Sequence, residues 1–189
     1  MNLKLIIILV ITYSYGLFEL FMGVKQKRKG NIEKSGDKSS VWMLVILIAF
    51  GYFFSFLIAS TKIGRIYHWN TFFTIGVIMT TLGLAIRITS ILTLKKQFTY
   101  TVTKIENHEL IERGLYKFIR HPAYLGQLII FAGISTALSN WVSITFMMIP
   151  VSIGFIHRIT IEEKFLKEQM GQQYMDYQKR TKRLIPMIY

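Results

Sequence analysis

Cysteine is absent from this chain, and acidic residues are scarce in it. Without cysteine there is no disulfide framework, no thiolate metal site and no nucleophilic thiol. Only 10 residues are Asp or Glu, against 23 Lys or Arg, so the formal net charge is +13. Hydrophobic residues make up 52% of the 189 residues, which is too apolar for a water-soluble domain of this size. The long uncharged runs favour a membrane protein with basic loops over a nucleic-acid binder.

Two enzyme motifs are also missing. No G-x-G-x-x-G follows a strand-like segment, which argues against a soluble Rossmann-type methyltransferase or dehydrogenase. No H-E-x-x-H is present, and the lack of cysteine weakens the case for a zinc site further. We therefore expect neither a metal ion nor a nucleic-acid partner.

The apolar runs predict an all-α integral membrane protein with about five transmembrane helices. A hydrocarbon core about 30 Å thick needs roughly 20 apolar residues in a helix. The predicted spans are residues 3–24, 41–60, 71–94, about 125–138 and 141 to about 157. The dipeptide Ser139-Asn140 turns the chain tightly, so the last two spans form a helical hairpin, and an amphipathic C-terminal helix follows. Because the fourth span is short, four spans with a re-entrant fourth segment is the alternative.

Lys and Arg are distributed unevenly between the two sides of these spans, and this bias sets membrane orientation. Eighteen lie after the first span, between the third and fourth spans, or in the C-terminal tail, whereas the opposite side holds only Lys4, Lys62 and Arg65. The bias predicts an extracellular N-terminus and a cytoplasmic C-terminus. We expect a multi-pass protein of the plasma membrane of a prokaryote.

Polar residues concentrate between residues 98 and 124, just before the fourth span. Pro122 disfavours helical dihedral angles at His121 and suits the first turn of a helix. Arg120 and His121 should therefore lie at the cytoplasmic interface, beside a helix N-terminus that favours negative charge. Taken in isolation, capping that helix is an equal alternative for His121.

A second polar cluster follows the fifth span. Arg158 and Glu162 are four residues apart, so they share one face of a helix, where a simple ion pair is the alternative to a functional role. If the last two spans form a hairpin, this cluster lies next to the first polar cluster at the cytoplasmic end of the hairpin. The predicted pocket combines cationic, anionic and aromatic groups, namely Arg120, Arg158, Glu162, Glu163, Tyr116 and Tyr124. Such a pocket suits a zwitterion that carries a ring system.

Two separated motifs run through these clusters. The first reads His108-x-Leu110-Ile111-x2-Gly114-x-Tyr116-x3-Arg120-His121-Pro122-x-Tyr124-x-Gly126. The second reads Arg158-x3-Glu162-Glu163-x2-Leu166-x4-Gly171-x2-Tyr174-x2-Tyr177, with Arg183-Leu-Ile-Pro186 near the end. Both resemble the signature of isoprenylcysteine carboxyl methyltransferases, including prokaryotic relatives and phospholipid methyltransferase-like proteins. The match covers residues 98–189, whereas residues 1–97 match only as a three-span membrane region of one continuous domain.

The resemblance implies an S-adenosylmethionine-dependent methyltransferase. Carried over position by position, it implies that Glu162 binds the amino group of the cofactor and that Arg158 is the catalytic residue that faces the substrate. The other implied cofactor-binding residues are His108, Glu109, Leu110, Ile111, Tyr116, His121, Pro122, Ala123 and Tyr124. Glu109 departs from the family pattern, which usually has an apolar residue at that position.

The implied acceptor is a lipophilic small molecule or a lipidated protein in contact with membrane lipid, most like the carboxylate of a prenylated cysteine. A lipid amine and a hydroxyl on an alkylated ring stay open. An ionised carboxylate needs no base, whereas a phenol or amine makes His121 or Glu163 a candidate base. An NADPH-dependent sterol-type reductase, with a similar terminal stretch at 185–189, and a non-catalytic membrane scaffold are the alternative functions. The oligomeric state stays open.

Four further residues have interpretations of their own. Trp141 and Tyr177 are predicted to belong to an interfacial aromatic belt. Arg87 interrupts the third span, and it either snorkels to the interface or faces the pocket. Glu19, near the cytoplasmic end of the first span, is predicted to be interfacial.

Overall fold

The computed structural model describes residues 3–27, 37–103 and 109–185. The helices are α1 Leu3–Lys27, α2 Ser39–Ala59, α3 Trp69–Leu94, α4 Pro122–Ala137, α5 Trp141–Met170 and α6 Gln172–Arg180, with the 3-10 helices η1 Lys95–Gln97 and η2 Gly114–Lys117. Within the described ranges, β-type pairing is limited to two isolated bridges, Arg65 with Asn140 and Ile119 with Lys182. The predicted all-α class is confirmed.

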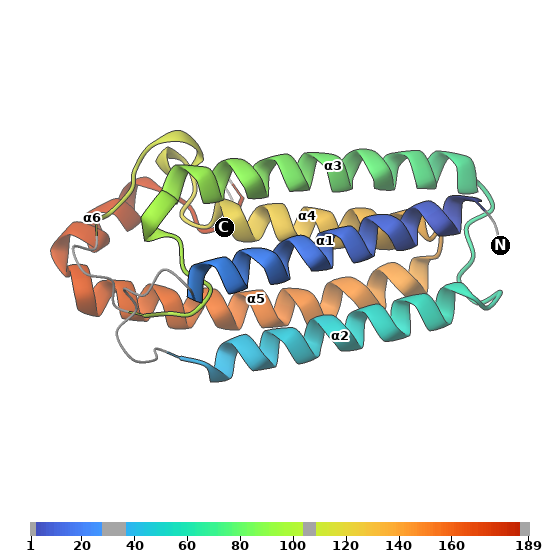
Figure 1. The fold of residues 1–189 in the computed structure, drawn as a ribbon, viewed down its shortest axis with the longest axis horizontal. Helices are drawn as coiled ribbons and strands as arrows, with labels where there is room; N and C mark the ends of the chain where they lie inside the picture. Colours follow the sequence, from blue (N-terminus) through green and yellow to red (C-terminus); the bar gives the residue numbers. More distant parts are fainter. Residues whose placement is uncertain (1–2, 28–36, 104–108, 186–189) are drawn as a thin grey trace.

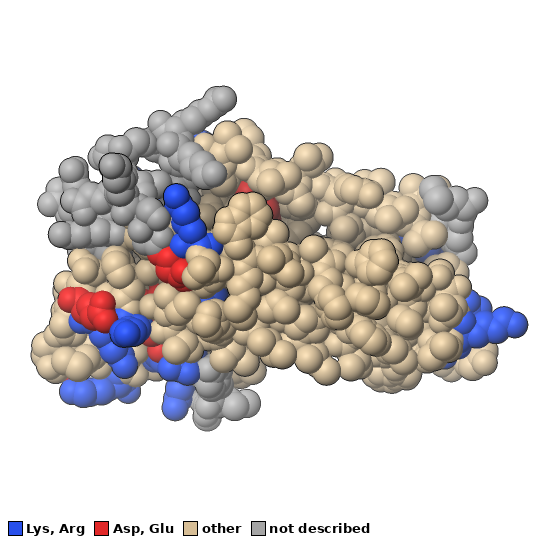
Figure 2. Space-filling model, turned by 90° about the horizontal axis from the view of Figure 1, so that it is seen from below, with Lys and Arg blue, Asp and Glu red and all other residues tan. Residues whose placement is uncertain are grey.

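The five longest helices run side by side along the long axis of the molecule, and α6 lies at one end of them (Figure 1). Four described helices are long and apolar enough to cross a membrane: Leu3–Lys25, Ser39–Ala59, Trp69–Gln97 and Trp141–Met170. Figure 2 shows Lys and Arg gathered toward the two ends of one face, with a broad band of other residues between them. The chain is a multi-pass integral membrane protein, as predicted.

α4 is the short member of the bundle, with 16 residues. At 1.5 Å per residue it is about 24 Å long, less than a hydrocarbon core of about 30 Å. It still reaches the far end of the bundle, because the turn after it meets the α2–α3 connection. There the Ile66 N–H donates to the Ser139 carbonyl at 2.8 Å, and the Trp141 N–H donates to the Gly64 carbonyl at 2.9 Å. This geometry favours five crossings over a re-entrant fourth segment, and the number of spans stays a prediction.

The predicted helical hairpin of α4 and α5 is present, and its turn is stabilised locally. Asn140 caps α5, since its side-chain oxygen accepts the N–H of Ser143 at 3.0 Å. The same amide group donates to the Ile63 carbonyl at 2.7 Å. The turn is therefore joined to the α2–α3 connection. From this turn α5 runs back along the bundle, so its C-terminal half lies at the end where α4 begins.

Glycines allow α3 and α4 to pack backbone against backbone. A Cβ added to Gly133 would lie 2.5 Å from Thr80 Oγ1 and 2.6 Å from the Gly76 carbonyl oxygen. A Cβ on Gly126 would lie 2.7 Å from the backbone nitrogen of Arg87. Small residues give membrane helices the close approach on which their packing depends. This contact places the first turn of α4 against α3.

Gly133→Ala should lower the free energy of unfolding by about 1–3 kcal/mol, because the added methyl group forces two backbones apart. The measurement is SDS titration of the protein in mixed micelles. Gly16→Ala on α1 is the matched control, since a Cβ there meets no described atom within 4 Å. That variant should be unchanged or more stable by up to about 1 kcal/mol. Equal losses from both variants would contradict the close-packing explanation.

α5 lies between α4 and α2 and contributes to the apolar core with both. The most buried core residues of α4 and α5 are Ile130, Phe131, Ile134, Met147, Val151 and Phe155. Two reciprocal hydrogen bonds join α2 to α5: Ser55 Oγ donates to the Ser143 carbonyl at 3.0 Å, and Ser143 Oγ donates to the Ser55 carbonyl at 2.8 Å. The hydroxyl of each buried serine thus has a hydrogen-bond acceptor across the interface, and neither hydroxyl is exposed to lipid.

Arg87 lies buried in the bundle, where it pairs with Glu19 of α1. Its Nε and Nη2 each donate to the Glu19 carboxylate at 3.0 Å, and Arg87 is only 2% exposed. Both predictions for Arg87 are wrong, because it neither snorkels to the interface nor lines the pocket described below. The pair joins positions 68 residues apart, so no local sequence pattern reveals it.

Candidate active site

A cavity opens at the α6 end of the bundle, enclosed by the segment after α3, the start of α4, and the C-terminal half of α5 with α6. Its empty space is about 850 Å³, including space that is open to solvent. Nine of the eleven residues predicted for the site line it: Glu109, Leu110, Ile111, Tyr116, His121, Ala123, Tyr124, Arg158 and Glu162. Pro122 is buried and lies outside the lining, whereas His108 falls outside the described residues.

Local sequence explains how α4 presents its polar residues to the cavity. Pro122 is the first residue of α4, and His121 directly before it has φ −124 and ψ 54, outside the helical region. The His121 ring stacks on the Tyr124 ring, with centroids 5.6 Å apart and planes 15° apart. The predicted helix start at Pro122 is therefore found, and the first turn of α4 carries two stacked rings into the site.

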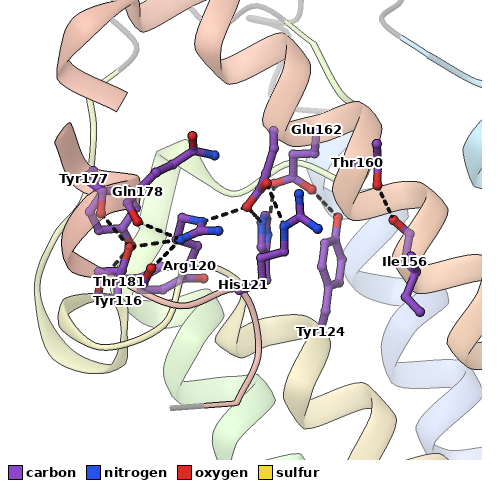
Figure 3. A network of polar contacts seen from close by, with 12 residues as sticks. Tyr116, Arg120, His121, Tyr124, Ile156, Thr160, Glu162, Tyr177, Gln178 and Thr181 are labelled. Atoms are coloured by element: carbon purple, nitrogen blue, oxygen red, sulfur yellow. Dashed lines mark hydrogen bonds and ion pairs between the residues drawn. The ribbon is translucent and has the colours of Figure 1, made fainter. Parts of the chain in front are cut away.

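Glu162 and Arg158 meet around the hydroxyl of Tyr124. The Tyr124 hydroxyl donates to Glu162 Oε2 at 2.6 Å and accepts from Arg158 Nε at 3.4 Å. Figure 3 shows Tyr124 and Glu162 pointing toward each other from α4 and α5, with His121 beside them. His121 Nδ1 lies 4.0 Å from Glu162 Oε1. The tyrosine hydroxyl thus separates the two charged groups, whose direct ion pair was the alternative considered above.

Arg158 is buried, 2% exposed, and its guanidinium joins three parts of the chain. Nη1 donates to Ser40 Oγ at 2.6 Å, at the start of α2, and Nη2 donates to the Tyr100 carbonyl at 2.8 Å. The Asp37 carboxylate lies 4.0 Å from Nη1. Burial raises the pKa of Asp37, but hydrogen bonds from Ser39 and Ser40 outweigh it and lower this pKa to about 2, so the carboxylate stays ionised.

Glu163 anchors the C-terminal tail. Its carboxylate accepts from Arg120 Nε at 2.7 Å and from Arg183 Nε at 2.9 Å, and it lies 3.3 Å from His121 Nε2. The backbone joins the same two segments, since the N–H of Arg120, before α4, donates to the carbonyl of Lys182, in the tail, at 2.7 Å. Glu163 was predicted as a second carboxylate of the pocket, but it is absent from the lining residues. It holds the segment before α4 against the tail.

Two tyrosines of α6 close the cavity on the side of the tail. Tyr177 is 3% exposed, and its hydroxyl donates to the Tyr116 carbonyl at 2.7 Å, so its assignment to an interfacial belt is wrong. Tyr174 is 1% exposed, and its hydroxyl lacks a hydrogen-bond partner among the described residues. Burial and the nearby Glu163 and Glu162 raise the pKa of Tyr174, which leaves its hydroxyl protonated and able to donate.

Ten further lining residues were not assigned to the site from the sequence, although the polar segment, the amphipathic helix and, for Leu166, the second motif pointed to their neighbourhood. They are Leu94, Gln97, Phe98, Thr99, Thr101, Val102, Thr103, Phe165, Leu166 and Met170. Phe98 to Thr103 alternates like a strand, yet it forms an irregular wall of the cavity. Trp141 lies at the opposite end of α5, 61% exposed, and its assignment to an aromatic belt stays a prediction.

The fold and the cavity define a multi-pass membrane protein with a charged pocket at one end of its helical bundle. The phospholipid methyltransferase family model matches residues 71–173, more than half of the chain. The chain belongs to this family, and the resemblance inferred from the two motifs is confirmed.

Two relatives of known name are protein-S-isoprenylcysteine O-methyltransferases. The chain is 35% identical over 115 residues to protein-S-isoprenylcysteine O-methyltransferase B of Arabidopsis thaliana, covering 60% of this chain and 58% of that protein. It is 36% identical over 123 residues to the Tribolium castaneum enzyme, covering 64% and 43%. The chain thus spans about half the length of the curated relatives it matches. These relatives are eukaryotic and do not support the predicted prokaryotic origin.

One solved structure is similar in fold. It is the eukaryotic intramembrane Ras methyltransferase, an isoprenylcysteine carboxyl methyltransferase, with a TM-score of 0.60 and 29% sequence identity. The likeness covers 81% of this chain and 55% of that one. The shared fold therefore extends beyond the segment that the family model matches.

Proposed function

We propose that this chain is an S-adenosylmethionine-dependent methyltransferase that acts on a lipophilic acceptor at the cytoplasmic face of the membrane. The observation that carries the proposal is the cavity in which Tyr124 links Glu162 to Arg158. The names of the relatives support the reaction type. The reductase and scaffold alternatives are not favoured. The cavity lies at the end that carries most of the Lys and Arg, which supports a cytoplasmic site and C-terminus.

The residues of the cavity fit the proposed cofactor. Glu162 offers a partly exposed carboxylate for an ammonium group, and the rings of Tyr116 and Tyr124 offer faces for a cation or a purine. The Tyr174 hydroxyl is a buried donor in need of an acceptor. The cofactor supplies a methyl group already activated on a sulfonium, so the protein has mainly to align the acceptor and exclude water.

The acceptor that Arg158 suits best is a carboxylate, and the relatives' names point to that of a prenylated cysteine. Three of the five N–H groups of Arg158 donate to described residues, and the two others, one on Nη1 near Asp37 and one on Nη2, are proposed to hold the acceptor carboxylate. An ionised carboxylate needs no general base, so Arg158 would orient the attacking oxygen. A lipidated acceptor would enter from the membrane, and residues 98–189 are proposed as the catalytic region.

Calorimetry on the detergent-purified protein tests this function. We expect S-adenosylmethionine to bind, and Glu162→Ala to weaken its binding by about 10- to 100-fold, the value of one charged hydrogen bond. Glu168→Ala is the matched control, because Glu168 is exposed on the same helix. Binding of NADPH alone would favour a reductase, and binding of neither ligand would favour a scaffold.

A further inference from the structure

A buried ion pair joins α1 to the rest of the bundle. Much of α1 faces outward: Tyr13 is 70% exposed and Leu17 is 66% exposed. Its inner face packs on the core through Ile8 and Tyr15 and carries Glu19, whose two carboxylate oxygens accept from the guanidinium of Arg87 at 3.0 Å. Both residues lie in helices apolar enough to cross a membrane. Charges in such segments are costly and mark functional positions more often than simple adhesion between helices.

The first connection from this pair to the cavity passes through Tyr100. The Tyr100 hydroxyl donates to Glu19 Oε2 at 2.8 Å. The backbone carbonyl of the same residue accepts Arg158 Nη2 at 2.8 Å. One residue therefore joins Glu19 on α1 to the guanidinium proposed to hold the acceptor.

The second connection leads from Arg87 to residues that line the cavity. Arg87 Nη1 donates to the carbonyl of Ala123, in the first turn of α4, at 3.4 Å, and Ala123 lines the cavity. The Arg87 guanidinium also lies over the Phe98 ring, 5.2 Å from its centroid, and Phe98 lines the cavity as well. Arg87 thus touches two lining residues from behind without reaching the cavity itself.

We propose that Glu19 and Arg87 are positioning residues for the methyl-transfer site, acting through Tyr100 on Arg158 and through Ala123 on the start of α4. The inference rests on the proposed function. The ion pair fixes the segment 98–103 against α1 and α3, and that segment fixes the Arg158 guanidinium. α1 is in this way a part of the active site although it contributes no lining residue among those described.

Tyr100→Phe isolates the first connection, because it removes one hydroxyl and keeps the ring that packs beside Arg87. We expect kcat to fall roughly 10-fold with a farnesylated, amino-blocked cysteine as acceptor, since misplacement of a positioning group lowers turnover. The dissociation constant of S-adenosylmethionine, measured by calorimetry, should change less than about 2-fold, because Tyr100 is not a lining residue. Tyr13→Phe, on the exposed face of α1, is the control and should leave both values unchanged.

The double variant Glu19→Leu/Arg87→Met separates positioning from stability. Apolar residues of similar volume often replace a buried ion pair without loss of stability, so SDS titration should show a folded protein. We expect kcat to fall at least as far as in Tyr100→Phe. Adding Tyr100→Phe to the double variant should produce no further loss, because the hydroxyl has already lost its partner.

Three outcomes decide the inference. Loss of kcat in a folded double variant, with no added effect of Tyr100→Phe, supports it. Full activity of that variant, or a loss of activity that follows loss of stability across all variants, overturns it while leaving the proposed function intact. Absence of methyl transfer by the unmodified protein overturns the proposed function and this inference with it.

Discussion

Replacing Arg158 with alanine should lower kcat by about 100-fold or more while the affinity for S-adenosylmethionine changes less than about 3-fold. The guanidinium is proposed to hold the acceptor in line with the methyl group, and in-line geometry is the main contribution this protein can make to such a displacement. Cofactor binding is proposed to depend instead on Glu162, which is separated from Arg158 by the Tyr124 hydroxyl. The checks are steady-state kinetics with varied acceptor and calorimetry with the cofactor.

Two further variants make the Arg158 prediction specific. Arg158→Lys keeps the charge but loses the planar fork, so kcat should still fall at least 10-fold. Ser40→Ala removes the 2.6 Å hydrogen bond that Arg158 makes to the start of α2, while Tyr124 and the Tyr100 carbonyl still hold the guanidinium. Its effect on kcat should stay below about 3-fold. Equal loss of turnover and cofactor affinity in Arg158→Ala would show that the proposed division of roles between Arg158 and Glu162 is wrong.

Glu163→Ala should destabilise the folded protein by about 3–5 kcal/mol. Glu163 is the common partner of Arg120, Arg183 and His121, and its side chain is 4% exposed. Without this carboxylate, the nearly buried guanidinium of Arg120 loses the negative partner of its Nε and keeps an uncompensated charge. The free energy of unfolding, measured by SDS titration, is the readout.

The matched control for Glu163 is Glu168→Ala, which removes an exposed carboxylate from the same helix and should change stability by less than about 0.5 kcal/mol. The loss of stability in Arg183→Ala should lie between those of the two glutamate variants, because Arg183 is partly exposed and only one of the contacts of Glu163 is lost. A loss below about 1 kcal/mol for Glu163→Ala would contradict its role as the anchor of the tail.

Most of the candidate site could be predicted because its residues belong to short motifs. His121, Pro122 and Tyr124 lie within four positions, and Arg158 and Glu162 share a helical face by their spacing alone. The Ser139-Asn140 turn then brings the two motifs to one end of the bundle. These are local signals, and they also sufficed to reveal the family.

The partners of Arg158 and Arg87 could not be predicted in the same way. Ser40 is 118 positions from Arg158, and Glu19 is 68 positions from Arg87. Each pairing depends on the rotation of one helix against another, which is decided by the packing of α1, α2 and α3 around the hairpin. Hydropathy identifies a span but leaves its rotation about its own axis open.

Sequence alone determined the membrane class of this protein, the position of its long apolar helices, the hairpin and the methyltransferase-like motifs, because each follows from hydropathy, turn chemistry or near-neighbour spacing. Only the tertiary structure decided that Glu163, unlike the adjacent Glu162, does not line the cavity. Neighbouring residues on an α-helix point about 100° apart. Packing therefore directed Glu162 into the cavity, and Glu163 toward Arg120 and the tail.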